Sequence, residues 1–230
     1  KVLGIGLPRP KDLGPIVIAW FISLGVLIFQ RDLGTSVLFF GLFVSMLYIA
    51  TQRRSWLIIG FFLFLGGAYF AYENFGHVQA RVTVWLDPWS YADTTGYQIV
   101  QSIYGLANGG ILGAGLGQGF PNLVPFASTD FIVAALGEEL GVTGIFVILL
   151  LYAILIERGL RTAITCRDGF GQLLAAGLSI TFALQVFVII GGVTGLIPLT
   201  GLTTPFLSYG GSSLIANWVV SVSYTQLTLA

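Results

Sequence analysis

The sequence predicts an all-α integral membrane protein with about six transmembrane helices. Hydrophobic residues make up 56% of the 230 residues and charged residues only 9%, whereas a soluble domain carries about 25% charged residues. The mean hydropathy is +0.91. Long apolar runs recur between short polar turns, and about 20 apolar residues are enough to cross a bilayer. The chain is therefore predicted to form one polytopic membrane domain, residues 1–230.

The apolar runs divide this domain into membrane spans and two long loops. The expected spans are residues 15–30, 33–50, 56–72, 131–156, 172–190 and 212–222, and the expected outer loops are 73–129 and 191–211. In the first loop, Ile99, Ile103 and Leu106 recur at helical spacing, which predicts a short amphipathic helix over 97–106. Tryptophan and tyrosine residues elsewhere in this loop suit a membrane interface.

Lysine and arginine residues fix the orientation of the spans. Only Arg31 and Arg81 fall on one side of the predicted topology. The other side holds the remaining cations, which are Lys1, Arg9, Lys11, Arg53, Arg54, Arg158, Arg161 and Arg167. Because cytoplasmic loops carry an excess of such residues, the second group is predicted to face the cytoplasm and both long loops to face outward.

Residue counts exclude several classes of site. The single cysteine, Cys166, cannot form an internal disulfide, and the single histidine, His77, has no partner at metal-ligand spacing. The run Gly113-Ala114-Gly115-Leu116-Gly117 looks superficially like a dinucleotide fingerprint. No strand precedes it, so a nucleotide site is rejected, and no nucleic-acid partner is expected. The glycines are expected instead to let the backbone pack closely or bend.

A carboxylate lies at the mouth of the fourth predicted span. Ser128 and Thr129 are good N-cap residues, and Asp130 falls in or beside the first turn. Carboxylates at membrane depth are costly, so the default interpretation is functional; the alternative is that Asp130 only caps the helix. Deeper in the span, the helical angle of 100° per residue favours Glu138 facing a cavity and Glu139 packing against a neighbouring helix.

Four motifs, in order, resemble those of the bacterial shape, elongation, division and sporulation family of RodA, FtsW and SpoVE. They are Arg31-Asp32-Leu33-Gly34-Thr35, the outer-loop segment from Gly96 to Gly115, Thr129-Asp130-Phe131-Ile132 followed by Gly137-Glu138-Glu139-Leu140-Gly141, and the loop from Ile197 to Leu214. The resemblance covers about residues 11–220 and is closer to the RodA branch. Members have about ten spans, so these six are expected to be the last six, with four before Lys1. The ending 223–230 departs from the family pattern.

The resemblance implies a cell-wall glycan polymerase of the bacterial cytoplasmic membrane. Such proteins join lipid II units on the outer face and release undecaprenyl diphosphate, for cell elongation and shape. One inverting displacement needs a base on the acceptor hydroxyl and charge stabilisation on the leaving diphosphate. Asp130 matches the essential aspartate of the family and is the candidate catalytic base. The resemblance also implies a partner, a class B penicillin-binding protein with a transpeptidase domain.

Other residues are candidates for binding the lipid II substrate. They are Arg31, Asp32, Arg81, Glu138, Ser208, Tyr209, Gly210, Gly211 and Ser212. The two arginines are the outer cations, so diphosphate binding could also use a divalent cation; no other cofactor is expected. Asp32 either lines a cavity or forms a local ion pair with Arg31. The loop 208–212 offers hydroxyl groups and free amides near a helix start, or else it is only a tight re-entrant turn.

Two other classes of function remain open from the sequence. A lipid II flippase would use the same carboxylates along a transport path. A non-catalytic membrane scaffold for wall-building complexes would keep its function when Asp130 is lost.

The charge bias makes a topology prediction. In a Cys166→Ser background, single cysteines at Ser55 and at Asp93 should react with impermeant reagents from opposite sides of intact cells, because 53–54 is predicted to be cytoplasmic and 73–129 external. Side-specific thiol labelling measures this. Labelling of Asp93→Cys from the cytoplasmic side alone would reverse the assignment.

Overall fold

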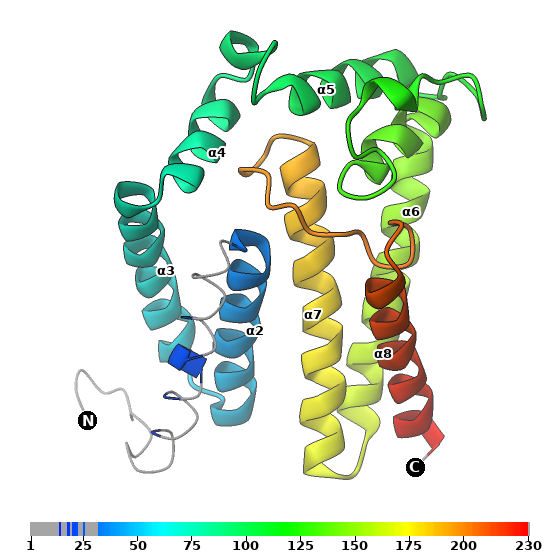
Figure 1. Cartoon of the computed structure of the whole chain (residues 1–230). Helices are drawn as coiled ribbons and strands as arrows, with labels where there is room; N and C mark the ends of the chain where they lie inside the picture. Colours follow the sequence, from blue (N-terminus) through cyan, green and yellow to red (C-terminus); the bar gives the residue numbers. More distant parts are fainter. Residues whose placement is uncertain (1–13, 15–17, 19, 23–24, 26–31, 230) are drawn as a thin grey trace. The chain divides into compact units, whose positions relative to one another are not determined.

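The computed structural model describes residues 14, 18, 20–22, 25 and 32–229 (Figure 1). In this part of the chain, helices alternate with turns and loops. No strand occurs among these residues. The chain forms two compact units, Lys1–Val78 and Gln79–Ala230, which are described separately below. The predicted span 15–30 and the candidate Arg31 fall mainly or wholly outside the described residues.

The first unit contains a pair of apolar helices joined by a basic turn. They are α2 (Leu33–Thr51) and α3 (Ser55–Asn74). A Cβ atom at Gly60 of α3 would lie 2.5 Å from Cγ1 of Val44, so the absence of a side chain there lets the two helices approach closely. Asp32 is the N-cap of α2: its carboxylate accepts a hydrogen bond of 3.0 Å from the Thr35 amide, as a capping aspartate does.

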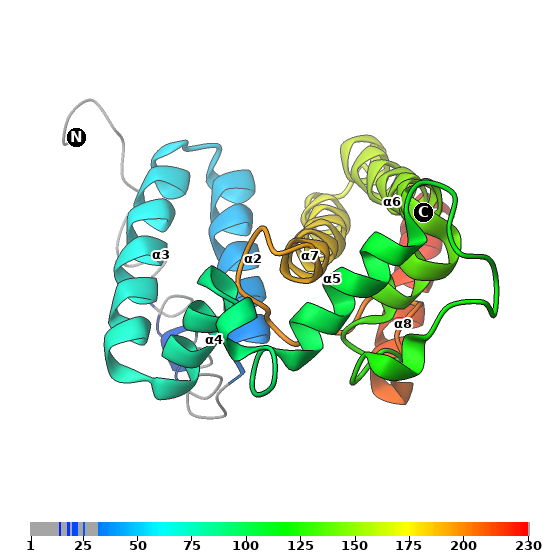
Figure 2. The same cartoon turned by 90° about the horizontal axis from the view of Figure 1, so that it is seen from above.

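The second unit begins with several short helices, which are followed by three long ones. The short helices are the end of α4 (Gly76–Leu86), η1 (Trp89–Tyr91), α5 (Tyr97–Gly109) and η2 (Pro121–Leu123). The long helices are α6 (Ile132–Thr165), α7 (Gly169–Val193) and α8 (Gly211–Leu229). Figures 1 and 2 show α5 running across the ends of α6 and α7, nearly at right angles to them.

The segment 73–129 contains more helix than the sequence predicted. Helix α5 covers the predicted range 97–106, but α4 was not foreseen. Its sequence is rich in valine and threonine, which are weak helix formers. Tertiary contacts stabilise it: Val84 is buried, and the Trp85 indole donates a hydrogen bond of 2.7 Å to the Gly195 carbonyl.

Four described helices are long and apolar enough to cross a membrane, namely α2, α3, α6 and α7. Helix α8 covers the expected range 212–222 and extends beyond it, but it is not among these four. Its serine, asparagine, threonine and glutamine residues lower its hydropathy. Helices α2, α3 and α7 occupy the ranges in which spans were expected, with ends that differ by a few residues, and α6 extends beyond its expected range.

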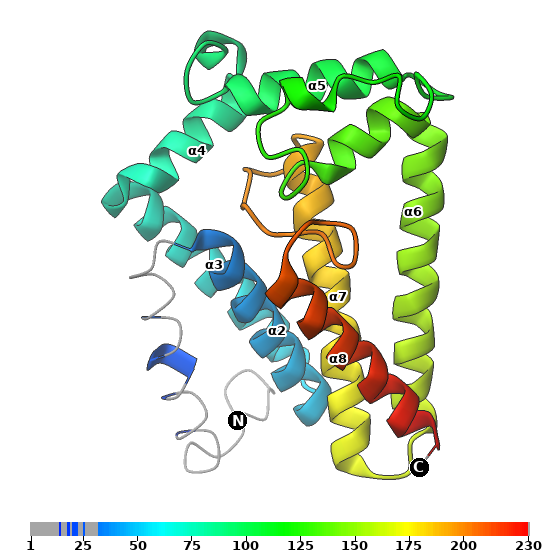
Figure 3. The same ribbon diagram turned by 45° about the vertical axis from the view of Figure 1, so that its right-hand side comes forward.

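Helix α6 is broken near its N-terminal end. Gly141 has φ +69° and ψ −173°, a conformation that residues with a side chain rarely adopt. The interrupted helix pairs there with the glycine-rich loop: amides of Ala114 and Gly115 donate to the carbonyls of Glu138 and Glu139 at 2.9 and 3.0 Å. A Cβ at Gly113 would lie 2.1 Å from the Glu139 carbonyl oxygen. The glycine run thus serves close backbone packing, and Figure 3 shows the resulting bend.

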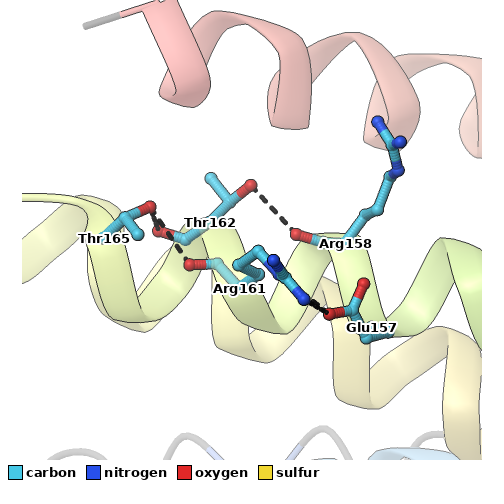
Figure 4. A network of polar contacts seen from close by, with 5 residues as sticks. All are labelled: Glu157, Arg158, Arg161, Thr162 and Thr165. Atoms are coloured by element: carbon cyan, nitrogen blue, oxygen red, sulfur yellow. Dashed lines mark hydrogen bonds and ion pairs between the residues drawn. The ribbon is translucent and has the colours of Figure 1, made fainter.

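At its other end α6 continues past Ile156, where the sequence predicted a loop. Glu157 and Arg161 are one helical turn apart, and the Arg161 Nε donates to Glu157 Oε1 at 2.8 Å (Figure 4). The hydroxyl of Thr162 donates to the Arg158 carbonyl at 3.1 Å. Such i,i+4 contacts favour a helix, although an exposed ion pair stabilises it only weakly.

A buried apolar cluster lies where α6 begins and α7 ends. It consists of Val124, Phe131, Val133, Ala134, Ile189 and Val193, with Ile99 of α5 and Leu199 and Leu202 of the following loop packed against it. Phe131 is only 1% exposed. Because Phe131 directly follows Asp130, burial of this ring fixes the main chain on which the candidate base is carried.

Candidate functional site

Asp130 does not cap helix α6. The helix begins at Ile132, its N-cap residue is Phe131, and no side chain makes a capping hydrogen bond. Asp130 lies in the preceding turn and is half-buried. Ser128 and Thr129, which the sequence suggested as caps, also lie in this turn. The capping interpretation of Asp130 is therefore wrong, and its carboxylate needs another explanation.

Gly201, in the loop after α7, lies next to both Asp130 and Arg81 of α4. A Cβ atom at Gly201 would lie 3.6 Å from Asp130 Oδ2 and 3.7 Å from Arg81 Nη2. Carboxylate and guanidinium therefore face the same point. Gly201 has φ +75°, which favours glycine, so no side chain fills the space between them. Three segments far apart in the sequence thus meet at one site.

Arg81 is held in this position by the loop. Its Nη1 donates a hydrogen bond of 3.0 Å to the Leu199 carbonyl, which leaves Nη2 turned toward Gly201 and Asp130. Trp85, one turn further along α4, donates to Gly195 in the same loop. Two contacts spaced i,i+4 therefore fix α4 against the 194–201 segment and orient the guanidinium.

Burial and charge act in opposite directions on Asp130. Burial raises the pKa of its carboxyl above the ordinary value, while the Thr129 hydroxyl and the Arg81 guanidinium lower that pKa by stabilising the carboxylate. Burial is the larger effect. The result is a carboxylate that is a better proton acceptor than a solvated aspartate, beside a cation that can pair with an anion.

The segment that follows Gly201 is anchored to the turn that carries Asp130. The Ser208 hydroxyl donates to the Thr129 carbonyl at 2.6 Å, and the Tyr209 amide donates to the Ser128 carbonyl at 2.7 Å. Ser208 is buried, whereas Tyr209 is 82% exposed. Gly211 is the first residue of α8, and Ser212 is exposed beside it.

Two phenylalanines in these loops adopt left-handed backbone conformations. Phe126 has φ +59° and Phe206 has φ +63°, which is uncommon for bulky residues. The Phe206 ring stacks on Phe182 of α7 at 5.8 Å and meets Trp218 of α8 edge-on at 5.8 Å. Packing holds the strained conformation, and such strain is frequent beside functional sites.

Glu138 lies elsewhere, under the glycine-rich loop. Its carboxylate is 3% exposed and accepts hydrogen bonds from Asn108 Nδ2 at 3.0 Å and from the Phe120 amide at 3.1 Å. Glu139 is half-buried and binds the loop through its carbonyl. The contacts of Glu138 fix both ends of the loop 108–120. Whether it also meets substrate, as the sequence suggested, stays a prediction.

Two of the remaining candidates precede the second unit in the chain. Asp32 is exposed and belongs to the first unit, and Arg31 is outside the described residues. Within the described part of the chain, no three histidine, cysteine, aspartate or glutamate side chains cluster as metal ligands. The Asp130 site supplies one carboxylate beside a guanidinium, so a divalent cation held there would need oxygen atoms of a substrate diphosphate as further ligands.

Sequence reasoning missed three contributors to the site. Gly201 and the carbonyl groups of Leu199 and Thr129 each contact or border the key side chains. Gly201 lies within the recognised motif, but only the folded loop shows that its missing side chain leaves space for Asp130 and Arg81. Main-chain carbonyl roles leave no residue-type signal in a sequence.

Comparisons with known proteins give consistent matches over nearly the whole chain. The family model of FtsW, RodA and SpoVE, described as cell cycle proteins, matches residues 7–223. A peptidoglycan glycosyltransferase RodA of Mycobacterium tuberculosis is 60% identical over 95% of this chain and 47% of its own length. A probable peptidoglycan glycosyltransferase FtsW of Geobacter metallireducens is 41% identical over 88% of this chain and 55% of its own length. The chain thus spans about half the length of these curated relatives.

Two solved structures share the fold. One chain, from work on how a peptidoglycan synthase complex coordinates polymerization and crosslinking, has a TM-score of 0.76 and 30% identity over 97% of this chain and 63% of its own. A crystal structure of the rod shape determining protein RodA of Thermus thermophilus has a TM-score of 0.62 over 97% of this chain and 58% of its own. At 23% identity, the second likeness shows the fold alone.

The contacts of Glu138 make a stability prediction. Glu138→Ala should lower the free energy of unfolding by about 1–3 kcal/mol, because two donors lose their acceptor in a buried place. Glu138→Gln keeps a side-chain oxygen and should lose less. Thermal unfolding of the purified protein measures both variants. Equal midpoints for wild type and Glu138→Ala would show that these hydrogen bonds do not hold the loop.

Proposed function

This chain belongs to the FtsW, RodA and SpoVE family, and on that premise we propose that it forms part of a glycosyltransferase that polymerises lipid II into peptidoglycan strands. The protein is an integral protein of the bacterial cytoplasmic membrane. We place the reaction on its outer face, in the service of cell elongation and shape. The observation that carries the proposal is that Asp130 and Arg81 face the same point beside Gly201.

Asp130 is the proposed general base. A sugar 4-hydroxyl of the acceptor attacks the anomeric carbon of the donor, and its proton passes to the Asp130 carboxylate. A new carbon–oxygen bond forms as the bond from the anomeric carbon to the diphosphate oxygen breaks. One displacement inverts an α-linked donor to a β-linked product, so a single base suffices. The raised pKa of Asp130 suits proton acceptance.

Arg81 is the proposed partner of the leaving group. Undecaprenyl diphosphate departs with negative charge, and a preorganised guanidinium stabilises such charge without having to reorient. Nη1 is already engaged by the Leu199 carbonyl, whereas Nη2 faces the site. This division lets one arginine be fixed in place and still offer a donor to the diphosphate.

The start of α8 is a second proposed contact with the diphosphate. Gly211 and Ser212, both exposed, and the half-buried Gly210 lie at the N-terminus of a 19-residue helix. Helix N-termini favour anions through their free amides and dipole. Tyr209, whose side chain is exposed while its amide is fixed to Ser128, is proposed to contact the sugar.

We also propose a class B penicillin-binding protein as the partner. The structural relative with a TM-score of 0.76 is a chain of a peptidoglycan synthase complex. A transpeptidase that crosslinks the strands would use the polymer as it leaves the membrane. Asp32, Arg31 and Glu138 remain proposed contacts of the lipid II substrate, without a described contact to the Asp130 group.

Loss of the base should abolish polymerisation. Full-length protein with its partner is assayed in detergent on lipid II, where no two membrane sides exist and a flippase has nothing to transport. Wild type should form glycan, and Asp130→Asn should lose about 10²–10⁴ in rate although the side chain is nearly the same size. Gel analysis of labelled lipid II measures polymer.

Each other outcome of this assay removes one interpretation. Polymer at near wild-type rate from Asp130→Asn would refute the base assignment. Absence of polymer from wild type would favour a flippase or a scaffold. Asp130→Asn should purify with its partner in wild-type yield, which controls for folding.

The charge of Arg81 makes a pH prediction. The polymerisation rate should fall as pH decreases through the raised pKa of Asp130, since only the carboxylate accepts a proton. Arg81 lowers this pKa, so Arg81→Gln should raise it further and move the acid limb of the rate profile to higher pH. Arg158→Gln, on the exposed far end of α6, is the control. An unchanged acid limb in Arg81→Gln would show that the charge of Arg81 does not affect the pKa of Asp130.

A further inference from the structure

The Ser208 hydroxyl has two main-chain partners in two different segments. It donates to the Thr129 carbonyl at 2.6 Å and accepts the Thr204 amide at 2.7 Å. A serine hydroxyl has one hydrogen to donate, and that hydrogen is engaged. The side chain is also 7% exposed. Ser208 therefore has neither a free donor nor the exposure that contact with a sugar or a phosphate requires.

These two partners belong to two different segments that form the candidate site. Thr129 directly precedes Asp130, and Thr204 lies three residues after Gly201, next to which Asp130 and Arg81 meet. The Tyr209 amide repeats the connection one residue along, by binding the Ser128 carbonyl at 2.7 Å. Two consecutive residues of the loop thus hold two consecutive peptides of the Asp130 turn.

The loop that Ser208 connects to Asp130 is itself fixed to the long helices. Gln185 of α7 donates to the Thr203 carbonyl at 2.9 Å. The Tyr152 hydroxyl of α6 donates to the Pro205 carbonyl, and both residues are buried. The 203–205 segment is therefore held by α6 and α7. Ser208 binds both this segment, at the Thr204 amide, and the peptide that precedes Asp130, at the Thr129 carbonyl. It therefore links the Asp130 turn to the part of the loop that α6 and α7 hold.

We propose that Ser208 is a positioning residue that sets the place of the Asp130 carboxylate relative to Gly201 and Arg81, and that it does not contact the substrate. This rests on the proposed role of Asp130. Without the hydroxyl, the Asp130 turn keeps the hydrogen bond from the Tyr209 amide and the apolar packing of Leu202 near Phe131, but it loses the direct bond to the peptide that precedes Asp130. A carboxylate displaced by about 1 Å from a reacting hydroxyl can cost about 10²-fold in rate, while the surfaces that bind lipid II stay in place.

The experiment compares kcat and KM for lipid II in full-length protein with its partner. Ser208→Ala should lower kcat by about 10- to 100-fold and leave KM within about twofold. The matched control is Ser102→Ala. Ser102 is also a buried serine, but its hydroxyl donates at 2.8 Å to Ile99 within the same helix α5. Ser102→Ala should leave kcat and KM unchanged, although it also removes the hydrogen bond of a buried serine hydroxyl.

Other results would overturn the proposal. A raised KM with unchanged kcat would place Ser208 in contact with substrate. Unchanged constants in both variants would show a purely structural hydroxyl, and equal losses in both would show general destabilisation. If Ser208→Ala does not accumulate, Tyr152→Phe removes the neighbouring support with little change of shape. That variant should also lower kcat alone, and unchanged constants would overturn the proposal.

The proposed function and this inference fail in different ways. Polymer from wild type, none from Asp130→Asn and full activity in Ser208→Ala would remove only the positioning role. Near wild-type activity in Asp130→Asn would overturn both, because Ser208 would then have no base to position.

Discussion

Buried main-chain N–H and C=O groups must find hydrogen-bond partners, most strictly within the hydrocarbon core of a bilayer, and the second unit of this chain is arranged around that constraint. Helices satisfy it by themselves. The loops before α6 and after α7 satisfy it by binding main-chain groups of other segments, as Tyr209 does at Ser128 and Ala114 does at Glu138. Each such pair joins parts of the chain that are distant in sequence. The site at Asp130 is a product of those joints.

Glycine allows these joints, because main chain must approach main chain closely. At Gly113 a side chain would collide with the Glu139 carbonyl, and at Gly141 it would collide with the Gly113 amide, 2.3 Å from the added carbon. The break in α6 therefore needs glycine on both sides. It lies nearly three turns beyond Phe131, so the short helical stretch that follows the Asp130 turn is held both by the glycine-rich loop and by the apolar cluster.

The sequence predicted the helices well, because apolar run length is a local property. The ranges of α2, α3, α5 and α7 match within a few residues. It did not predict α4, because the tertiary contacts of Trp85 and Arg81 override weak local propensity. It placed the end of α6 too early, at Ile156, because charged residues suggested a loop where i,i+4 contacts extend the helix. Asp130 was found through its motif, but the capping alternative could be rejected only from the observed helix start.

In the proposed reaction a single carboxylate accepts a proton while an anion leaves, and the geometry at Asp130 suits both tasks. A base must be charged to accept a proton, yet its charge repels a diphosphate. The guanidinium of Arg81, which faces the same point beside Gly201, would offset that repulsion, while burial raises the pKa of the carboxyl. Neither group can do so unless both are held still. In this chain, loops that are hydrogen-bonded to the long helices hold Asp130 and Arg81 in place. The geometry of the site therefore depends on main-chain hydrogen bonds, which cannot be predicted from residue types.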